Sequence, residues 1–239
     1  MMPEALLLDF DGTLVDWRAG LAEGIRAAAA QFSRLHGFDA DEVAARTLAF
    51  EGELFAEHGD AWYLGGIGVA ELYGAVWRRT HDEYGVDPEA APLLAEAHWR
   101  AELGGVRSYD DVAALLEAAR GAGIRTAVIT NGPGPVQRGK LAAAGLSDAF
   151  DAVLISGEVG SAKPDVRIFE TALAELGVAA ERAWHIGDTL AYDIAGARAA
   201  GVGAVWLNRD GVTRDAAEAM PHREIATLAE LLPLLARAA

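Results

Sequence analysis

Short apolar runs alternate with helical stretches through most of this chain, and no other feature of the sequence constrains the fold as strongly. Each run is bounded by a turn and is typical of a strand that is buried on both faces. Strands that alternate with helices form a parallel sheet covered by helices on both sides. We therefore predict an α/β fold with a doubly wound, Rossmann-like parallel sheet, whose strands are residues 5–10, 125–130, 152–156, 183–187 and 204–207.

The interval between the first two predicted strands does not alternate in this way. Residues 16–104 show long Ala- and Leu-rich helical patterning and no convincing buried strand. We predict an inserted all-helical domain over residues 16–104 and an α/β core formed by residues 1–15 and 105–239. The helices predicted in the insert are residues 21–35, 40–57, 69–84 and 89–103, with a glycine-rich break at 59–68, and those in the core are 110–120, 136–144, 165–176 and 190–200.

The composition limits the chemistry and the partners that are available. With 239 residues and 52% hydrophobic residues, the chain is long enough for one large core, or a core and a smaller domain. It has no cysteine, which excludes disulfides, thiolate nucleophiles and cysteine zinc sites. A net charge of −16 argues against nucleic acid as a partner, because binding its backbone requires a basic surface. A small anion could still bind in a locally positive pocket.

The N-terminus gives no sign of a membrane partner or of export. It reads MMPEALLLDFDG, has no basic flank, and its apolar run is far shorter than a signal peptide or membrane span. We expect a cytoplasmic protein, and the sequence leaves open whether it is a monomer or a homodimer.

Two aspartates, Asp9 and Asp11, stand where the first predicted strand ends. Residues i and i+2 of a strand point to the same side, so both carboxylates can project beyond the carboxyl end of the sheet. Carboxylates this close repel each other unless a cation binds there or one of them is protonated. Either arrangement is useful for phosphoryl transfer.

Other polar residues follow later strands. Thr130 and Asn131 end a buried strand just before Gly132, where a hydroxyl and backbone N–H groups can cradle phosphate oxygens. Lys163 precedes a helix opening near Asp165 and can reach a shared pocket as a point charge.

A second pair of aspartates follows the fourth predicted strand. Asp188 comes directly after Gly187, and Asp193 lies at the start of the next helix. Their oxygens are hard ligands that suit Mg²⁺ rather than zinc or copper, although Asp193 could also serve only as a helix cap. We interpret His185, inside the strand, as a packed core residue and assign it no catalytic role.

These stretches together resemble the haloacid dehalogenase-like hydrolases. The first motif of that family, DxDGT, matches residues 9–13, and its Thr or Ser motif matches Thr130. Its lysine motif matches Lys163, and its acidic motif matches Asp188 with Asp193. The four motifs occur in the family's order and extend over the whole chain.

The resemblance implies a Mg²⁺-dependent phosphatase that acts on a small phosphomonoester, such as a sugar phosphate, a nucleotide or a phosphorylated short acid. Asp9 would be the nucleophile that forms an aspartyl-phosphate, and Asp11 the general acid and base. Mg²⁺ would be held by Asp9, Asp188 and the backbone carbonyl of Asp11, with Asp193 positioning Lys163 or a metal-bound water. Residues Gly12, Thr13, Thr130, Asn131 and Lys163 would bind the phosphorylated substrate.

The helical insert would act as a cap that selects the substrate. Arg18 could meet an anionic group of the substrate or remain a surface residue. Trp17 could line the seam between the domains, and Trp62 and Tyr63 could form a wall of the pocket or pack inside the insert. The segments around Thr130 and Lys163 look most similar to nucleotide and acylneuraminate phosphatases.

Three alternatives remain open at this point. Phosphomutases of the superfamily use the same four motifs. The 2-haloacid dehalogenases share the scaffold but lack the second acid that Asp11 supplies. A non-catalytic protein that binds a phosphorylated metabolite would keep the fold but would have no use for Asp11 as a proton donor.

Overall fold

The computed structural model describes residues 2–236, and its central element is a six-stranded sheet in which all neighbouring strands are parallel. The strand order is β3-β2-β1-β4-β5-β6. The strands are β1 (Ala5–Leu8), β2 (Arg125–Thr130), β3 (Ala152–Ile155), β4 (Ala183–Gly187), β5 (Gly203–Leu207) and β6 (Arg223–Ile225). The predicted fold class is confirmed. The sequence analysis missed β6, a short edge strand whose first two residues are charged and exposed, because it contains no apolar run.

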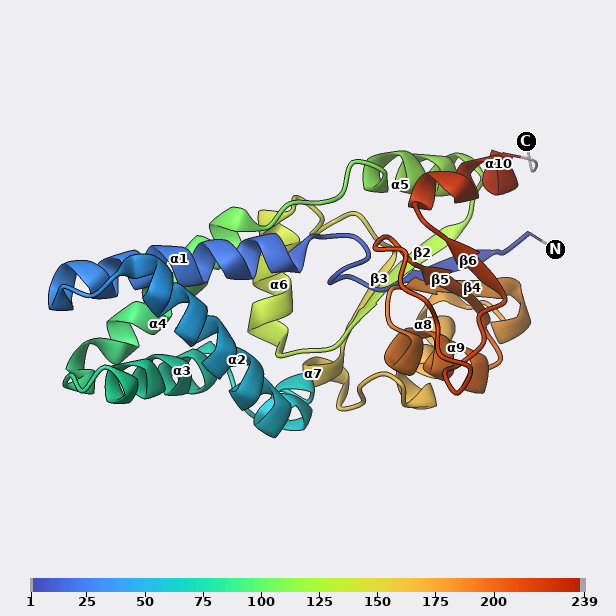
Figure 1. The fold of residues 1–239 in the computed structure, drawn as a ribbon. Helices are drawn as coiled ribbons and strands as arrows, with labels where there is room; N and C mark the ends of the chain where they lie inside the picture. Colours follow the sequence, from blue (N-terminus) through green and yellow to red (C-terminus); the bar gives the residue numbers. More distant parts are fainter. Residues whose placement is uncertain (1, 237–239) are drawn as a thin grey trace.

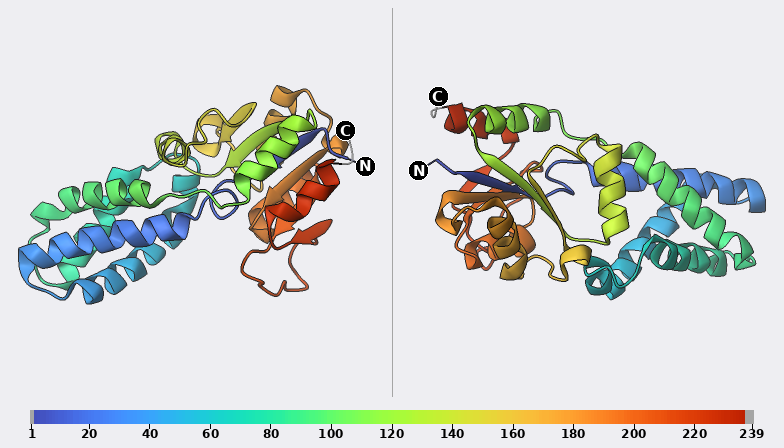
Figure 2. Two further views of the ribbon diagram at one scale, coloured as in Figure 1. Left: turned by 90° about the horizontal axis from the view of Figure 1, so that it is seen from above. Right: turned by 180° about the vertical axis from the view of Figure 1, so that it is seen from behind.

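Helices cover both faces of the sheet (Figures 1 and 2), as the doubly wound prediction requires. Neighbouring residues of a strand point to opposite faces, so β1 sends Leu6 and Leu8 to one face and Leu7 to the other. Two separate hydrophobic cores result. The first lies under α5 (Val112–Gly121) and α10 (Leu232–Leu235), and the second under α8 (Val166–Leu176) and α9 (Ala195–Ala199).

Four helices between β1 and β2 pack on one another and extend to one side of the sheet (Figure 1). They are α1 (Trp17–His36), α2 (Ala40–Tyr63), α3 (Val69–Glu83) and α4 (Ala91–Gly105). Their own core contains the fully buried side chains of Phe32, Trp77 and Leu94. The division into residues 16–104 and a core of residues 1–15 and 105–239 stays a prediction.

Two predicted helix boundaries differ from the structure by four residues or more. Helix α1 begins four residues earlier than predicted, because the side chain of Asp16 caps it by accepting a hydrogen bond from Ala19 N at 3.1 Å. The predicted break at 59–68 starts only at Leu64, since α2 runs through Gly59 to Tyr63. A helix tolerates an isolated glycine, and the last turn of α2 places Trp62 in the core of the insert.

The connections after the carboxyl ends of β2, β3 and β4 contain further helical elements. Helix α6 (Gly134–Ala143) packs against α4 of the insert, and α7 (Ser156–Val159) is a single turn after β3. The helix predicted at 190–200 begins with a π-helical turn, Leu190–Ile194, before α9. Within residues 2–236, no helix combines the length and the apolar character needed to cross a bilayer.

The packing of α5 on the sheet gives a prediction about stability. Leu115 is fully buried in the first core, so Leu115→Ala should lower the free energy of unfolding by about 2–5 kcal/mol. Leu93 is 54% exposed, so the control Leu93→Ala should change it by less than about 0.5 kcal/mol. Urea unfolding measures both values, and equal values would contradict the burial of α5.

Candidate active site

The predicted functional residues meet at the carboxyl ends of three neighbouring strands. Asp9 follows β1, Thr130 ends β2 and Asp188 follows β4. The strand order changes direction between β1 and β4, and ligands of open α/β sheets bind at such switch points. A cavity of about 250 Å³ lies here, with further walls from α1, α2, α3 and α4 of the insert.

Lys163 is the centre of the buried charge network. Its side chain is 3% exposed, and its Nζ lies 2.5 Å from Asp9 Oδ1 and 2.6 Å from Asp193 Oδ1. Burial by itself would lower the pKa of Lys163, but the carboxylates of Asp193 and Asp9 outweigh it and raise the pKa. The lysine therefore stays a cation that joins the end of β1 to the turn after β4.

Asp9 keeps one oxygen free. Oδ1 accepts the hydrogen bond from Lys163, while Oδ2 is buried and has no hydrogen-bond partner. Burial raises the pKa of Asp9, against the opposing charge of Lys163. A buried oxygen without a partner is costly, so its presence points to a ligand that approaches it.

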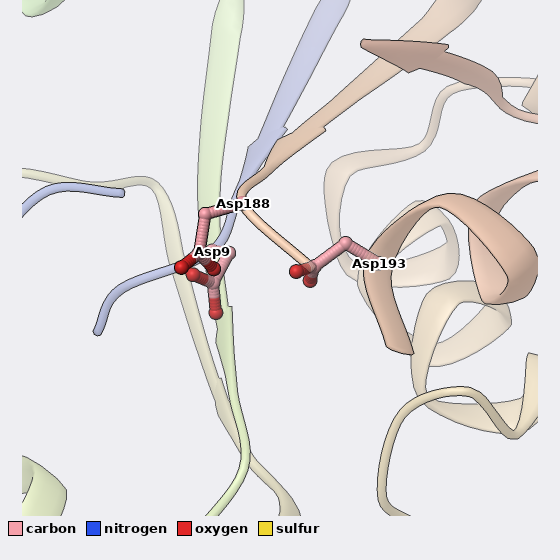
Figure 3. A group of neighbouring side chains, drawn as sticks. All are labelled: Asp9, Asp188 and Asp193. Atoms are coloured by element: carbon pink, nitrogen blue, oxygen red, sulfur yellow. The ribbon is translucent and has the colours of Figure 1, made fainter. Parts of the chain in front are cut away.

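A divalent cation fits among the carboxylates around Asp9. Asp9, Asp188 and Asp193 each offer a carboxylate oxygen within 4.8 Å of the others, and Figure 3 shows the three side chains pointing toward one another. Burial and the negative charge of Asp193 raise the pKa of Asp188 to about 7. Carboxylate oxygens with this excess of negative charge match the preference of Mg²⁺.

The oxygens of Asp193 are already occupied. Oδ1 contacts Lys163 and also lies 3.0 Å from Nε2 of His185, and Oδ2 accepts a hydrogen bond from Thr189 N at 3.0 Å. Burial works against its ionisation, but Lys163 and His185 lower the pKa of Asp193 below the usual range. His185 is fully buried and packs edge-on against Phe169, which agrees with its interpretation as a core residue. Its contact with Asp193 was not predicted.

The carboxylate of Asp11 lies outside the group formed by Asp9, Asp188 and Asp193. It faces α6 instead, where Gln137 Nε2 donates to Oδ2 at 2.8 Å and Lys140 Nζ donates to Oδ1 at 3.2 Å. Its side chain is 25% exposed and lines the cavity, so a substrate can reach it.

Sequence reasoning missed the residues around Asp11. Lys140 is buried and also lies 3.6 Å from Glu102 of α4, and Glu102 accepts a hydrogen bond from Tyr73 of α3 at 2.6 Å. Burial would lower the pKa of Lys140, but Asp11 and Glu102 raise it overall. The sequence did offer one signal, the rarity of lysine, since only two of the 20 Lys and Arg residues are lysines. In the structure both lysines contact an aspartate of this site.

Thr130 and Asn131 both line the cavity, and their binding of phosphate stays a prediction. The hydroxyl of Thr130 accepts a hydrogen bond from Gln137. The side chain of Asn131 forms two hydrogen bonds with the backbone of Lys163. It accepts one from the Lys163 N–H at 2.8 Å and donates one to the Lys163 carbonyl oxygen at 2.9 Å. The side chain of Asn131 thus holds the lysine in place.

Neither Gly12 nor Thr13 lines this cavity, although Gly12 lines a neighbouring one together with Asp188, and substrate binding by the two residues stays a prediction. The chain turns back after Asp11, with Leu14 N bonded to Phe10 O at 2.8 Å, and this turn buries the Thr13 side chain completely. Gly12 has a φ of +88°, and a Cβ on it would lie 2.3 Å from Oδ2 of Asp188. The absence of a side chain at Gly12 therefore leaves room for Asp188.

Four residues of the insert that the sequence analysis considered all line the cavity: Trp17, Arg18, Trp62 and Tyr63. Arg18 is exposed and makes an ion pair with Asp210 at 3.4 Å. Trp62 is 8% exposed and also belongs to the core of the insert. The ring of Tyr63 meets that of Tyr192 edge-on, which joins the end of α2 to the turn after β4.

Comparison with known proteins gives a family match over most of the chain. A family model described as "Hydrolase: haloacid dehalogenase-like hydrolase" matches residues 3–201. A phosphoserine phosphatase of Thermus thermophilus is 45% identical over 156 residues, 65% of this chain and 62% of that relative. A ribulose-1,5-bisphosphate 5-phosphatase of Halopiger xanaduensis is 30% identical over 98% of this chain and 100% of its own length.

A solved structure of a 2-haloacid dehalogenase from Pseudomonas syringae pv. Tomato DC3000 has the same fold. It is 29% identical, has a TM-score of 0.69, and the match covers 100% of both chains. The scaffold is therefore shared by proteins named for two different reactions.

The contact between Gly12 and Asp188 can be tested with a matched pair of variants. Gly12→Ala should push Asp188 away and weaken Mg²⁺ binding about 10–100-fold, measured by calorimetric titration. Gly37 has a similar φ of +81° with nothing within 4 Å, so Gly37→Ala carries the same backbone strain, about 1–2 kcal/mol, without touching the site. Equal Mg²⁺ affinities of the two variants would show that Gly12 does not shape the site.

Proposed function

The chain belongs to the haloacid dehalogenase-like hydrolases, and we propose that it is a magnesium-dependent phosphatase that hydrolyses a small phosphomonoester with Asp9 as nucleophile. The observation that carries the proposal is the asymmetric environment of Asp9. One oxygen is held by Lys163 at 2.5 Å, while the other is buried without a partner. This is the arrangement expected of a carboxylate that must attack an electrophile in a fixed direction.

The reaction proceeds in two displacements. The free oxygen of Asp9 attacks the phosphorus, and the bond to the leaving alkoxide breaks as Asp11 gives that oxygen its proton. Asp11 then takes a proton from a water molecule, which attacks the aspartyl-phosphate and releases phosphate and Asp9. Lys163 and Thr130 bind phosphoryl oxygens, and Asn131 and Asp193 keep Lys163 in position.

Asp9 and Asp188, with the backbone carbonyl of Asp11, would hold Mg²⁺. The ion supplies positive charge that offsets the repulsion between an anionic nucleophile and an anionic phosphate. Asp193 is better suited to positioning than to metal binding, because both of its oxygens already accept hydrogen bonds.

The cavity favours a small leaving group. Its volume of about 250 Å³ lies below the roughly 300–1,000 Å³ of pockets for drug-sized ligands. A phosphorylated short acid or a sugar phosphate suits a space of this size. The names of the two relatives, a phosphoserine phosphatase and a ribulose bisphosphate phosphatase, support the same range of substrates.

A 2-haloacid dehalogenase is the second candidate, favoured by the likeness to the Pseudomonas syringae protein. Asp11 argues against it, since carbon–halogen cleavage expels a halide that needs no proton. Chloride release from 2-chloropropionate, compared with phosphate release from an aryl phosphate, separates the two reactions.

We expect Asp9→Asn to lower phosphate release from 4-nitrophenyl phosphate by on the order of 10⁴-fold, because the amide is not a nucleophile. The assay contains Mg²⁺, and EDTA should abolish the wild-type rate until Mg²⁺ is restored. Equal rates of wild type and Asp9→Asn would remove Asp9 from the mechanism and leave a binding protein as the better explanation.

Asp11→Asn should lower turnover roughly 100-fold or more. It should largely spare the affinity for Mg²⁺, because the carboxylate of Asp11 faces α6 and lies outside the group formed by Asp9, Asp188 and Asp193. Calorimetric titration with Mg²⁺ checks this, with Asp188→Asn as the variant that should lose affinity. Complete loss of Mg²⁺ binding in Asp11→Asn would identify its side chain as a ligand.

A further inference from the structure

Lys140 has no part in the reaction as described above, although it is one of only two lysines in the chain and is buried beside Asp11. We propose that Lys140 is the positioning residue that orients Asp11 toward the leaving group, and that the inserted helices hold Lys140 through Glu102. This inference rests on the proposed function, because it assigns a role relative to the acid and base of that reaction.

The geometry around Asp11 fixes its carboxylate at both oxygens. Lys140 donates to Oδ1 at 3.2 Å and Gln137 donates to Oδ2 at 2.8 Å. The two donors are three residues apart on α6, so they lie on the same face of that helix. Two bonds from one rigid element prevent the carboxylate from rotating toward Asp9 and Asp188, where it would add a further negative charge.

The ammonium of Lys140 is in turn held from the insert. Glu102 of α4 lies 3.6 Å from it and is itself fixed by the hydroxyl of Tyr73 at 2.6 Å. The ring of Tyr73 stacks on that of His98, with 4.2 Å between ring centroids. Tyr73 and Glu102 both line the cavity, so the orientation of Asp11 depends on side chains of the same insert that encloses the substrate.

A buried cation between two carboxylates needs an explanation, since an ion pair of this kind contributes little net stability and an apolar replacement is often as stable. The side chains of Lys140 and Glu102 are only 10% and 3% exposed. Catalytic sites retain buried ion pairs of this kind, because the ion pairs fix a reacting group within a narrow range of angles.

The test uses two aryl phosphates that differ in how much the leaving oxygen needs a proton. Phenoxide is a strong base and depends on the proton of Asp11, whereas 4-nitrophenoxide leaves readily without it. The ratio kcat/KM reports steps up to the departure of the leaving group, so the later attack of water does not enter. We expect Lys140→Met to lower kcat/KM roughly 10–100-fold for phenyl phosphate and less than about threefold for 4-nitrophenyl phosphate.

Two further variants serve as controls. Lys140→Arg keeps the charge and should restore much of the phenyl phosphate activity. Arg138 is an exposed cation on the same helix that pairs with Glu158, so Arg138→Met should leave both kcat/KM values unchanged. An equal fall for both esters in Lys140→Met would indicate a structural role only, and no fall would show that Lys140 does not position Asp11.

Crystal structures of Lys140→Met and Glu102→Gln provide a readout that does not depend on activity. The Asp11 carboxylate should leave its position beside Gln137 in Lys140→Met, and an unchanged position would overturn the proposal. If Lys140→Met does not fold because Glu102 is left unpaired, the double variant with Glu102→Gln removes that charge. Failure of the wild type to hydrolyse either ester would instead contradict the proposed phosphatase function.

Discussion

The two ion pairs of Lys163 are the interaction on which the site depends. Its ammonium joins Asp9, at the end of β1, to Asp193, in the π-helical turn after β4. A buried ammonium needs such partners, and the two carboxylates need the ammonium, because they lie close to Asp188 as well. The same contacts make the two oxygens of Asp9 unequal, since they occupy one oxygen and leave the other free.

The site carries more negative charge than its lysines can offset. Burial raises the pKa of both Asp9 and Asp188, which means that ionising them in the absence of a further cation is unfavourable. Some carboxylates must be ionised to function although burial opposes their ionisation. Such carboxylates are typical of sites that bind a metal or a charged ligand. The helices of the insert add Glu102 to this environment, so they contribute to the electrostatics of the site as well as enclosing it.

Much of the fold could be predicted because buried parallel strands and amphipathic helices leave distinct local patterns. The runs that became β2 and β4 are examples, since every residue after the first in β2 is buried. The elements that were missed have no such pattern. Strand β6 lies at the edge of the sheet and presents charged residues to solvent, and Gly59 continues a helix because the packing of Trp62 outweighs the low helix propensity of glycine.

For the site, the sequence by itself determined which chemistry is available, since the order and spacing of Asp9, Asp11, Thr130, Lys163 and Asp188 place carboxylates, a hydroxyl and an ammonium at strand ends. Only the tertiary structure decided which of these groups contact one another. In the folded chain Asp11 contacts Gln137 and Lys140 and not the other aspartates. Asp188 lies so close to Gly12 that a side chain there would collide with it. The reason is physical: a local pattern fixes on which side of an element a residue lies, whereas its partners come from segments as much as 154 residues away that meet only when the sheet and the insert have packed.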